Sequence, residues 1–237
     1  MDKIASLEYI PKFLKVLSKP EKDGYSRLVP MELWPSQRYY IEHRSHRDIV
    51  VKSRQTGFST GLLADNAVAL LTRQFERQVV IAHDDETASF LLTTVHRFRD
   101  NLPGSIRPKV DWRSGIRLRF PELDNYIYID SAKSDSIGIG RSLTRAHLSE
   151  VAKWPSQKEQ QLFADISQTV SSFGWMTLES TPRGRGGLFF ELYQAAKEGK
   201  LNYKTFFFPW WWDVTAIAPI LAGKELDSQI ERAAFAL

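Results

Sequence analysis

Short apolar runs alternate with helical patterns along most of the chain. The runs with the composition of buried strands are 49–51, 79–82, 126–129, 146–148 and 175–178. The segments with helical spacing of apolar residues are 35–43, 59–71, 86–99, 156–169 and 187–198. Apolar strands that alternate with helices favour a mostly parallel sheet covered by helices on both faces. We therefore predict an α/β fold.

The two ends of the chain depart from this alternation. Residues 1–30 combine a short amphipathic stretch (7–17) with turn-rich sequence, and we expect an N-terminal appendage there. Segment 116–120 has the pattern of a hairpin arm that leads into the strand at 126–129. Segment 203–208 has the pattern of a last strand, which ends at Pro209. The predicted core thus covers 31–209. Residues 210–237, aromatic and then helical over 224–236, form a small C-terminal linker or lid segment.

Composition narrows the class of protein. With 237 residues, 43% hydrophobic and 25% charged, the chain can fold as one large domain with its own core. It has no cysteine, which excludes disulfides and Cys-ligated metals. Its start does not resemble a signal peptide, and no apolar stretch reaches the ~20 residues of a membrane helix, so we expect a soluble protein without a membrane partner.

The net charge of +4 is mild, but basic residues gather in one segment. Seven lie between positions 97 and 119: Arg97, Arg99, Arg107, Lys109, Arg113, Arg117 and Arg119. Such a segment is either a solvated hairpin or a surface that contacts nucleic-acid phosphates.

A candidate phosphate-binding loop follows the strand at 49–51. The sequence Lys52-Ser53-Arg54-Gln55-Thr56-Gly57-Phe58-Ser59-Thr60 joins that strand to a helix, and a helix N-terminus after a tight loop attracts anions. Ser59 occupies the position of the hydroxyl that holds Mg²⁺ in a P-loop. However, Lys52 stands where the first Gly of that motif belongs and Phe58 where its Lys belongs. Lys52 or Arg54 must then supply the missing cation.

Three further features occur in the order that a P-loop ATPase requires. Gln37, after Trp34 and Pro35 at a helix start, can pair with an adenine edge. The strand at 146–148 ends in Ser149-Glu150, where such enzymes usually carry Asp-Glu; Glu150 is a candidate general base. Ser180-Thr181-Pro182 follows the next strand, at the ligand-facing edge of a parallel sheet. Each feature alone is more often plain structure, but their shared order is hard to explain by chance.

Together these motifs resemble the ATPase domain of the large terminase subunit of tailed phages. The loop is similar to that family's deviant Walker A, Ser180-Thr181-Pro182 to its coupling motif, and Phe207-Phe208-Pro209-Trp210-Trp211-Trp212-Asp213 to its aromatic exit from the ATPase core. The resemblance covers about 33–213. It implies an additional-strand (ASCE, RecA-like) P-loop ATPase that uses ATP and Mg²⁺ to move double-stranded viral DNA into a procapsid, in the host cytoplasm. It also implies a homo-oligomeric ring, a pentamer in this family, with portal protein and small terminase subunit as partners.

The resemblance also assigns residues. Nucleotide contacts fall on Trp34, Gln37, Thr181 and the loop residues Lys52, Ser53, Arg54, Gln55, Thr56, Gly57, Phe58, Ser59 and Thr60. It assigns metal binding to Ser59 and Ser149. It assigns catalysis to Glu150, Lys52 and Arg54, together with an arginine that acts in trans. Arg141 is the candidate for this arginine and Arg145 the reserve. The terminase nuclease domain has no counterpart before Leu237, so no nuclease activity is expected, and 210–237 would lead toward that absent domain. The alternatives are a helicase-like nucleic-acid translocase and a DNA-binding module with weak catalysis.

Overall fold

The computed structural model of the chain describes residues 2–18, 24–113, 116–134 and 142–212. Within these ranges, an eight-stranded sheet has the strand order β10-β3-β9-β8-β4-β7-β6-β5. Its strands are β3 (Arg47–Lys52), β4 (Arg77–Ala82), β5 (Trp112–Arg113), β6 (Arg117–Phe120), β7 (Asn125–Ser131), β8 (Leu143–Ser149), β9 (Val170–Ser180) and β10 (Lys204–Phe208). Neighbours from β10 to β7 are parallel, whereas β6 pairs antiparallel with both β7 and β5. The predicted mostly parallel sheet and its hairpin are confirmed.

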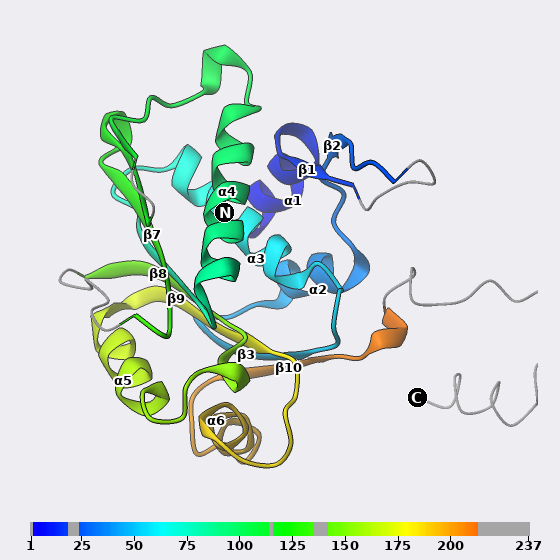
Figure 1. Cartoon of the computed structure of the whole chain (residues 1–237), viewed down its shortest axis with the longest axis vertical. Coiled ribbons are helices and arrows are strands. Elements are labelled where there is room, and N and C mark those ends of the chain that lie inside the picture. The colour runs from blue at the N-terminus through cyan, green and yellow to red at the C-terminus, as the bar shows by residue number, and fades with distance from the viewer. Residues whose placement is uncertain (1, 19–23, 114–115, 135–141, 213–237) are drawn as a thin grey trace, which may run out of the picture.

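Helices cover both faces of the sheet (Figure 1). One face packs against α2 (Pro35–His43), α3 (Phe58–Thr72) and α4 (Asp85–Asp100), and the other against α5 (Glu159–Thr169) and α6 (Leu188–Lys197). Short 3-10 turns lie at η1 (Gly104–Ile106), η2 (Pro121–Leu123), η3 (Val151–Lys153) and η4 (Trp210–Trp212). This is the predicted α/β architecture, with two apolar cores separated by the sheet.

The N-terminal segment shares the core on the α3 side. It forms α1 (Asp2–Phe13) and a two-stranded hairpin of β1 (Lys15–Leu17) and β2 (Leu28–Pro30). The buried side chains of Ile10, Leu14 and Met31 belong to the same cluster as α3. The helix begins at Asp2 and ends at Phe13, so the amphipathic stretch expected over 7–17 is divided between a helix and a strand.

Strand β9 lies between β3 and β8 and is hydrogen-bonded to both. Val51 of β3 pairs in register with Ser180, and Ser149 of β8 pairs with Glu179. The strand that leads into the loop and the strand that ends at Ser149 are therefore separated by one additional strand, as the ASCE prediction requires. All three strands end at the same edge of the sheet.

A row of polar side chains runs under α3 toward that edge. On β8 these are Arg145, His147 and Ser149, and on β9 Thr177 and Glu179, while Leu148 and Leu178 point into the opposite core. Strand residues alternate between faces, so one strand presents a polar face to α3 and an apolar face to α5 and α6.

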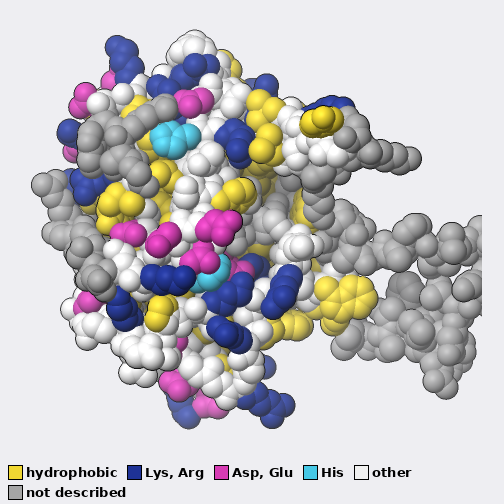
Figure 2. Space-filling model, in the orientation of Figure 1, with side chains coloured by type: hydrophobic (Ala, Val, Ile, Leu, Met, Phe, Trp, Pro, Cys, Tyr) yellow, Lys and Arg dark blue, Asp and Glu magenta, His cyan; other side chains and the backbone are white. Residues whose placement is uncertain are grey.

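Charged side chains of both signs are mixed on the face of the molecule in Figure 2. Over the described ranges, no helix combines the length and apolar character needed to cross a membrane.

Candidate active site at the carboxyl edge of the sheet

The loop between β3 and α3 has the backbone of an anion site. Gln55 (φ 59°) and Gly57 (φ 62°) both adopt the left-handed conformation, and Gly57 is the N-cap of α3. Glycine adopts this conformation without a steric penalty, which explains its place before the helix. The amides of the first turn of α3 face out of the helix end, where the macrodipole favours a negative charge.

Gln37 braces this loop from α2. Its Nε2 donates to the Gly57 carbonyl at 2.9 Å, and its Oε1 accepts from the Trp34 amide at 3.0 Å. A Cβ on Gly61 would lie 2.8 Å from Gln37 Cγ, so only glycine at 61 lets α2 approach so closely. Gln37 is buried and Trp34 half-buried. The structure thus gives Gln37 a structural task, and adenine recognition by Trp34 and Gln37 stays a prediction.

The side chain of Phe58 is part of the core. Its ring is 2% exposed and lies 5.4 Å from the Tyr40 ring and 5.2 Å from the Phe208 ring, between centroids. Of the predicted nucleotide contacts, the one at Phe58 is therefore limited to its backbone amide. The residue that replaces the usual Walker lysine anchors α3 to the sheet.

Lys52 points into the site from the end of β3. Its Nζ lies 2.7 Å from Glu150 Oε1 and 3.3 Å from Glu179 Oε2, and its side chain is 6% exposed. Burial lowers the pKa of the ammonium, but the charges of Glu179 and Glu150 outweigh burial and raise the pKa above its ordinary value. Lys52 is therefore a fixed cation beside the candidate phosphate-binding loop.

Arg54 takes a different position. It is exposed on the loop, as is Gln55, whereas Ser53, Ser59 and Thr60 are half-buried and Thr56 is buried. Of the two candidate cations, Lys52 is the one held by the carboxylates of Glu150 and Glu179.

Glu150 follows β8 in a strained conformation. Its φ of 53° is left-handed, which is uncommon for a residue with a side chain and often marks functional sites. Its carboxylate accepts from Thr181 Oγ1 at 3.1 Å and lies 3.1 Å from Lys153 Nζ, besides the contact with Lys52. Burial and the Glu179 charge raise the pKa of Glu150, but the Lys52 ammonium and hydrogen bonds from Lys52 and Lys153 lower it overall. The predicted general base is thus ionised and linked to the predicted coupling threonine.

Glu179 is the central residue that the sequence did not reveal. Its carboxylate is fully buried, and Oε1 accepts from Ser59 Oγ and Ser149 Oγ, both at 2.7 Å, with His147 Nε2 at 3.3 Å. Burial raises the pKa of this carboxyl, but Lys52, His147 and Ser149 together bring it well below its usual range. The available signal is an acidic residue two positions after Thr177, in a strand whose alternate residues are apolar. The motifs that indicate the other site residues do not include it.

The two arginines considered for action in trans have different outcomes. Arg141 lies outside the described residues. Arg145 is buried on β8, with Nη1 3.4 Å from Asp65 Oδ2 and Nε 3.7 Å from Glu76 Oε2. A side chain enclosed in this way cannot reach a neighbouring subunit, so the reserve candidate is wrong.

The donor set fits Mg²⁺ only together with a nucleotide. Ser59 and Ser149 offer hydroxyl oxygens and Glu179 a carboxylate, the hard oxygen chemistry that Mg²⁺ prefers. In the described segments no group of three acidic, His or Cys side chains could hold a metal by itself. Mg²⁺ is usually bound by one or two protein groups plus phosphate oxygens and water, which agrees with this arrangement.

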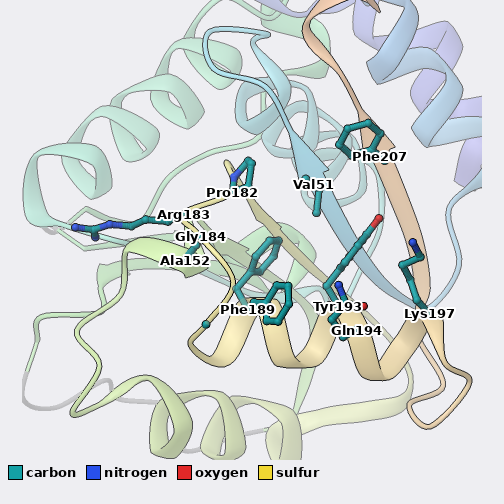
Figure 3. Close-up of a pocket in the computed structure, with 12 residues that line it drawn as sticks. Val51, Ala152, Pro182, Arg183, Gly184, Phe189, Tyr193, Gln194, Lys197 and Phe207 are labelled. Atoms are coloured by element: carbon teal, nitrogen blue, oxygen red, sulfur yellow. The ribbon is translucent and has the colours of Figure 1, made fainter.

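An apolar pocket of about 450 Å³ lies on the other face of β3 (Figure 3). Phe189 and Tyr193 of α6 line it, with Val51 and Phe207 of the sheet and the Pro182–Gly184 loop. Neither Lys52 nor the Glu150 and Glu179 carboxylates line this pocket, so it is separate from the candidate active site.

Several basic side chains of the segment 97–119 contact other groups of the protein itself. Arg99 donates to the Pro108 carbonyl and Arg107 to the Leu102 carbonyl, while Arg117 lies over the Tyr126 ring at 5.9 Å. Lys109 and Arg119 meet solvent, with side chains 84% and 50% exposed.

Comparison with solved structures identifies the same fold in phage large terminases. The HK97 bacteriophage large terminase matches with a TM-score of 0.72 at 17% identity, over 98% of this chain and 51% of that chain. The Thermus phage P74-26 large terminase ATPase domain matches with a TM-score of 0.55 at 19% identity, over 80% of this chain and 85% of that domain. A large terminase from another thermophilic bacteriophage, in complex with ADP, matches with a TM-score of 0.55 at 18% identity, over 73% of this chain and 42% of that chain.

The resemblance drawn from the motifs is therefore confirmed at the level of the fold, which is that of the terminase ATPase domain. The chain spans about half the length of the HK97 protein. No protein-family model matches the sequence, and no curated protein does.

Proposed function

We propose that this chain is the ATP-hydrolysing domain of a motor that translocates double-stranded viral DNA into a procapsid. The observation that carries the proposal is the position of Lys52. It is a buried cation at the end of the loop strand, 2.7 Å from Glu150, the candidate base just after β8, which lies two places away in the sheet. The thermophilic-phage large terminase that was solved with ADP, and that shares the fold, was also solved with ATP-gamma-S.

The nucleotide phosphates would lie against the amides of the 53–57 loop and the first turn of α3. Lys52 would exchange its carboxylate contacts for phosphate oxygens and neutralise their charge. Ser59 would hold Mg²⁺, which when bound neutralises the charge on the transferred phosphoryl group. The deviant loop would thereby keep a lysine at the phosphates, although that lysine comes from the preceding strand.

Glu150 would act on the attacking water. In the hydrolytic step the water oxygen bonds to the γ-phosphorus, the bond to the bridging oxygen of ADP breaks, and the water proton passes to the Glu150 carboxylate. Release of Glu150 from Lys52 would accompany phosphate binding. Thr181, which donates to Glu150 at 3.1 Å, would relay this change into the loop after β9.

The motor would act as a ring on DNA, with portal protein and small terminase subunit as partners, in the host cytoplasm. An arginine of the neighbouring subunit, with Arg141 as candidate, would neutralise transition-state charge. A pentameric ring and these partners rest on the likeness to large terminases.

The deciding experiment measures ATP hydrolysis with Mg²⁺ for the wild type and for Glu150→Ala, at several protein concentrations, with nucleotide binding followed in parallel. We expect hydrolysis to fall by about 10²–10⁴-fold in the variant while binding persists. A rate per subunit that rises with concentration would support the arginine in trans. If the wild type binds no nucleotide, Lys52 does not replace the Walker lysine, and a DNA-binding module becomes the favoured alternative.

A further inference from the structure

We infer that Glu179 supplies, from the neighbouring strand, the anion that the Ser149 position lacks, and that it orients Ser59 as a ligand of nucleotide-bound Mg²⁺. The inference rests on the proposed nucleotide site and names a positioning residue within it. Ser149 and Glu179 are register partners on adjacent strands.

The contacts of Glu179 argue against a purely structural role. It has no exposed surface, and one ammonium, Lys52, lies between it and Glu150. Glu179 Oε2 makes no hydrogen bond to any described residue, and its nearest cation, Lys52 Nζ, is 3.3 Å away. A buried ion pair stabilises a fold little more than apolar side chains of the same size would, so stability alone does not account for an acid here.

The geometry instead explains Glu179 as the site's negative charge, placed on the strand next to the Ser149 position. Ser149 donates to Glu179 Oε1 at 2.7 Å, so the carboxylate lies within hydrogen-bond reach of the end of β8. A serine at that position can hydrogen-bond but carries no charge. The negative charge is therefore present at the site but is attached to β9.

Ser59 is the group through which Glu179 would act. Its hydroxyl donates to Glu179 Oε1 at 2.7 Å, which leaves the lone pairs of the hydroxyl oxygen directed away from the carboxylate. Groups that orient a metal ligand in this way usually change metal affinity by about 10–100-fold when they are removed.

The test measures the Mg²⁺ concentration that half-maximally stimulates binding of a fluorescent ATP analogue to the full chain. For Glu179→Gln we expect this concentration to rise about 10–100-fold over wild type. The double variant Ser149→Asp/Glu179→Gln returns the charge to β8, and its midpoint should lie within about threefold of wild type because the lost anion is restored beside the metal ligand. Glu122→Gln, at an exposed carboxylate outside the site, is the matched control and should leave the Mg²⁺ midpoint in place. Glu150→Gln, which removes the other carboxylate beside Lys52, is measured alongside it.

An unchanged midpoint in Glu179→Gln would overturn the inference, as would an equal shift in Glu150→Gln, because the carboxylate would then act only through Lys52. If Glu179→Gln does not fold, Glu179→Asp takes its place, because it withdraws the carboxylate from Ser59 by one methylene: a midpoint about tenfold higher supports the inference, and an unchanged midpoint overturns it. A wild type that binds no nucleotide refutes the proposed function itself, which is a distinct result.

Discussion

The side-chain amide of Gln37 donates a hydrogen bond to the carbonyl of Gly57 at 2.9 Å and thereby ties α2 to the loop between β3 and α3. The contact depends on Gly61, one turn into α3, where a Cβ would lie 2.8 Å from Gln37 Cγ. Hydrogen bonds of this kind contribute about 0.5–1.5 kcal/mol. The position of the loop is therefore set by a residue that lies outside it.

Gly61→Ala should weaken nucleotide binding about three- to tenfold, since the substitution removes one hydrogen bond. Gly104→Ala is the matched control, because a Cβ there meets nothing within 4 Å. Titration of a fluorescent nucleotide measures both variants. Adding Gln37→Ala to Gly61→Ala should cause little further loss, and an additive loss would show that Gly61 acts independently of Gln37.

Lys52 and Arg54 can be separated by substitution. Lys52→Met should weaken nucleotide binding about 10–100-fold, because charged hydrogen bonds contribute about 1.5–3 kcal/mol, whereas Arg54→Met should change it little. Lys52→Met also leaves the buried Glu179 without its cation and should destabilise the fold by about 3–5 kcal/mol.

Thermal unfolding checks this second effect. The combination Lys52→Met/Glu179→Gln should recover stability without recovering binding. A larger binding loss in Arg54→Met than in Lys52→Met would assign the phosphate cation to Arg54 instead.

Asp65 holds together a buried ionic cluster beneath α3. It lies 3.0 Å from Arg44 and 3.4 Å from Arg145, and Asp65→Asn should destabilise the fold by about 3–5 kcal/mol, because two buried guanidinium groups lose their shared partner. Urea denaturation at neutral pH measures this. Asp111→Asn, at a 62% exposed carboxylate, should change stability by less than about 0.5 kcal/mol.

The same cluster predicts a pH dependence. Burial raises the Asp65 pKa, but Arg44 and Arg145 outweigh it and hold the pKa below its ordinary 3.8. A depressed carboxyl pKa contributes stability above the unfolded-state value and loses it as the pH falls through the folded-state value. The free energies of unfolding of wild type and Asp65→Asn should therefore differ most near neutral pH and converge below about pH 4. A constant difference from pH 7 to pH 3 would contradict this.

The exposed cations of the basic segment are the ones to test against DNA. Lys109→Glu/Arg119→Glu should weaken binding of duplex DNA and reduce the slope of log K against log salt by about 2, close to one unit for each phosphate interaction removed. Lys197→Glu/Lys200→Glu, at two exposed lysines at the end of α6 and just after it, changes the net charge by the same amount and is the control. An unchanged slope in the double variant would exclude this surface as the DNA-binding surface.

The sequence predicted the sheet well because its strands are short apolar runs between clear helices. It predicted β9 too short: the strand begins at Val170, but Ser171, Ser172 and Gly174 interrupt the apolar pattern near its start. Charged groups were harder to place. Arg145 is buried because Asp65, in a helix 80 residues earlier, neutralises it, and Glu179 lies in the site because β9 is inserted between β3 and β8. Neither relation is local in sequence.

The insertion of β9 has a mechanical consequence. Glu179 and Thr181 are two residues apart at the end of this one strand; the first contacts Ser59 and Lys52, and the second contacts Glu150. A shift of the strand end by a fraction of an ångström would loosen both sets of contacts together, while the hydrogen bonds to β3 and β8 resist larger displacement. If nucleotide binds as proposed, occupancy of the loop and release of Glu150 would both depend on the end of this one strand.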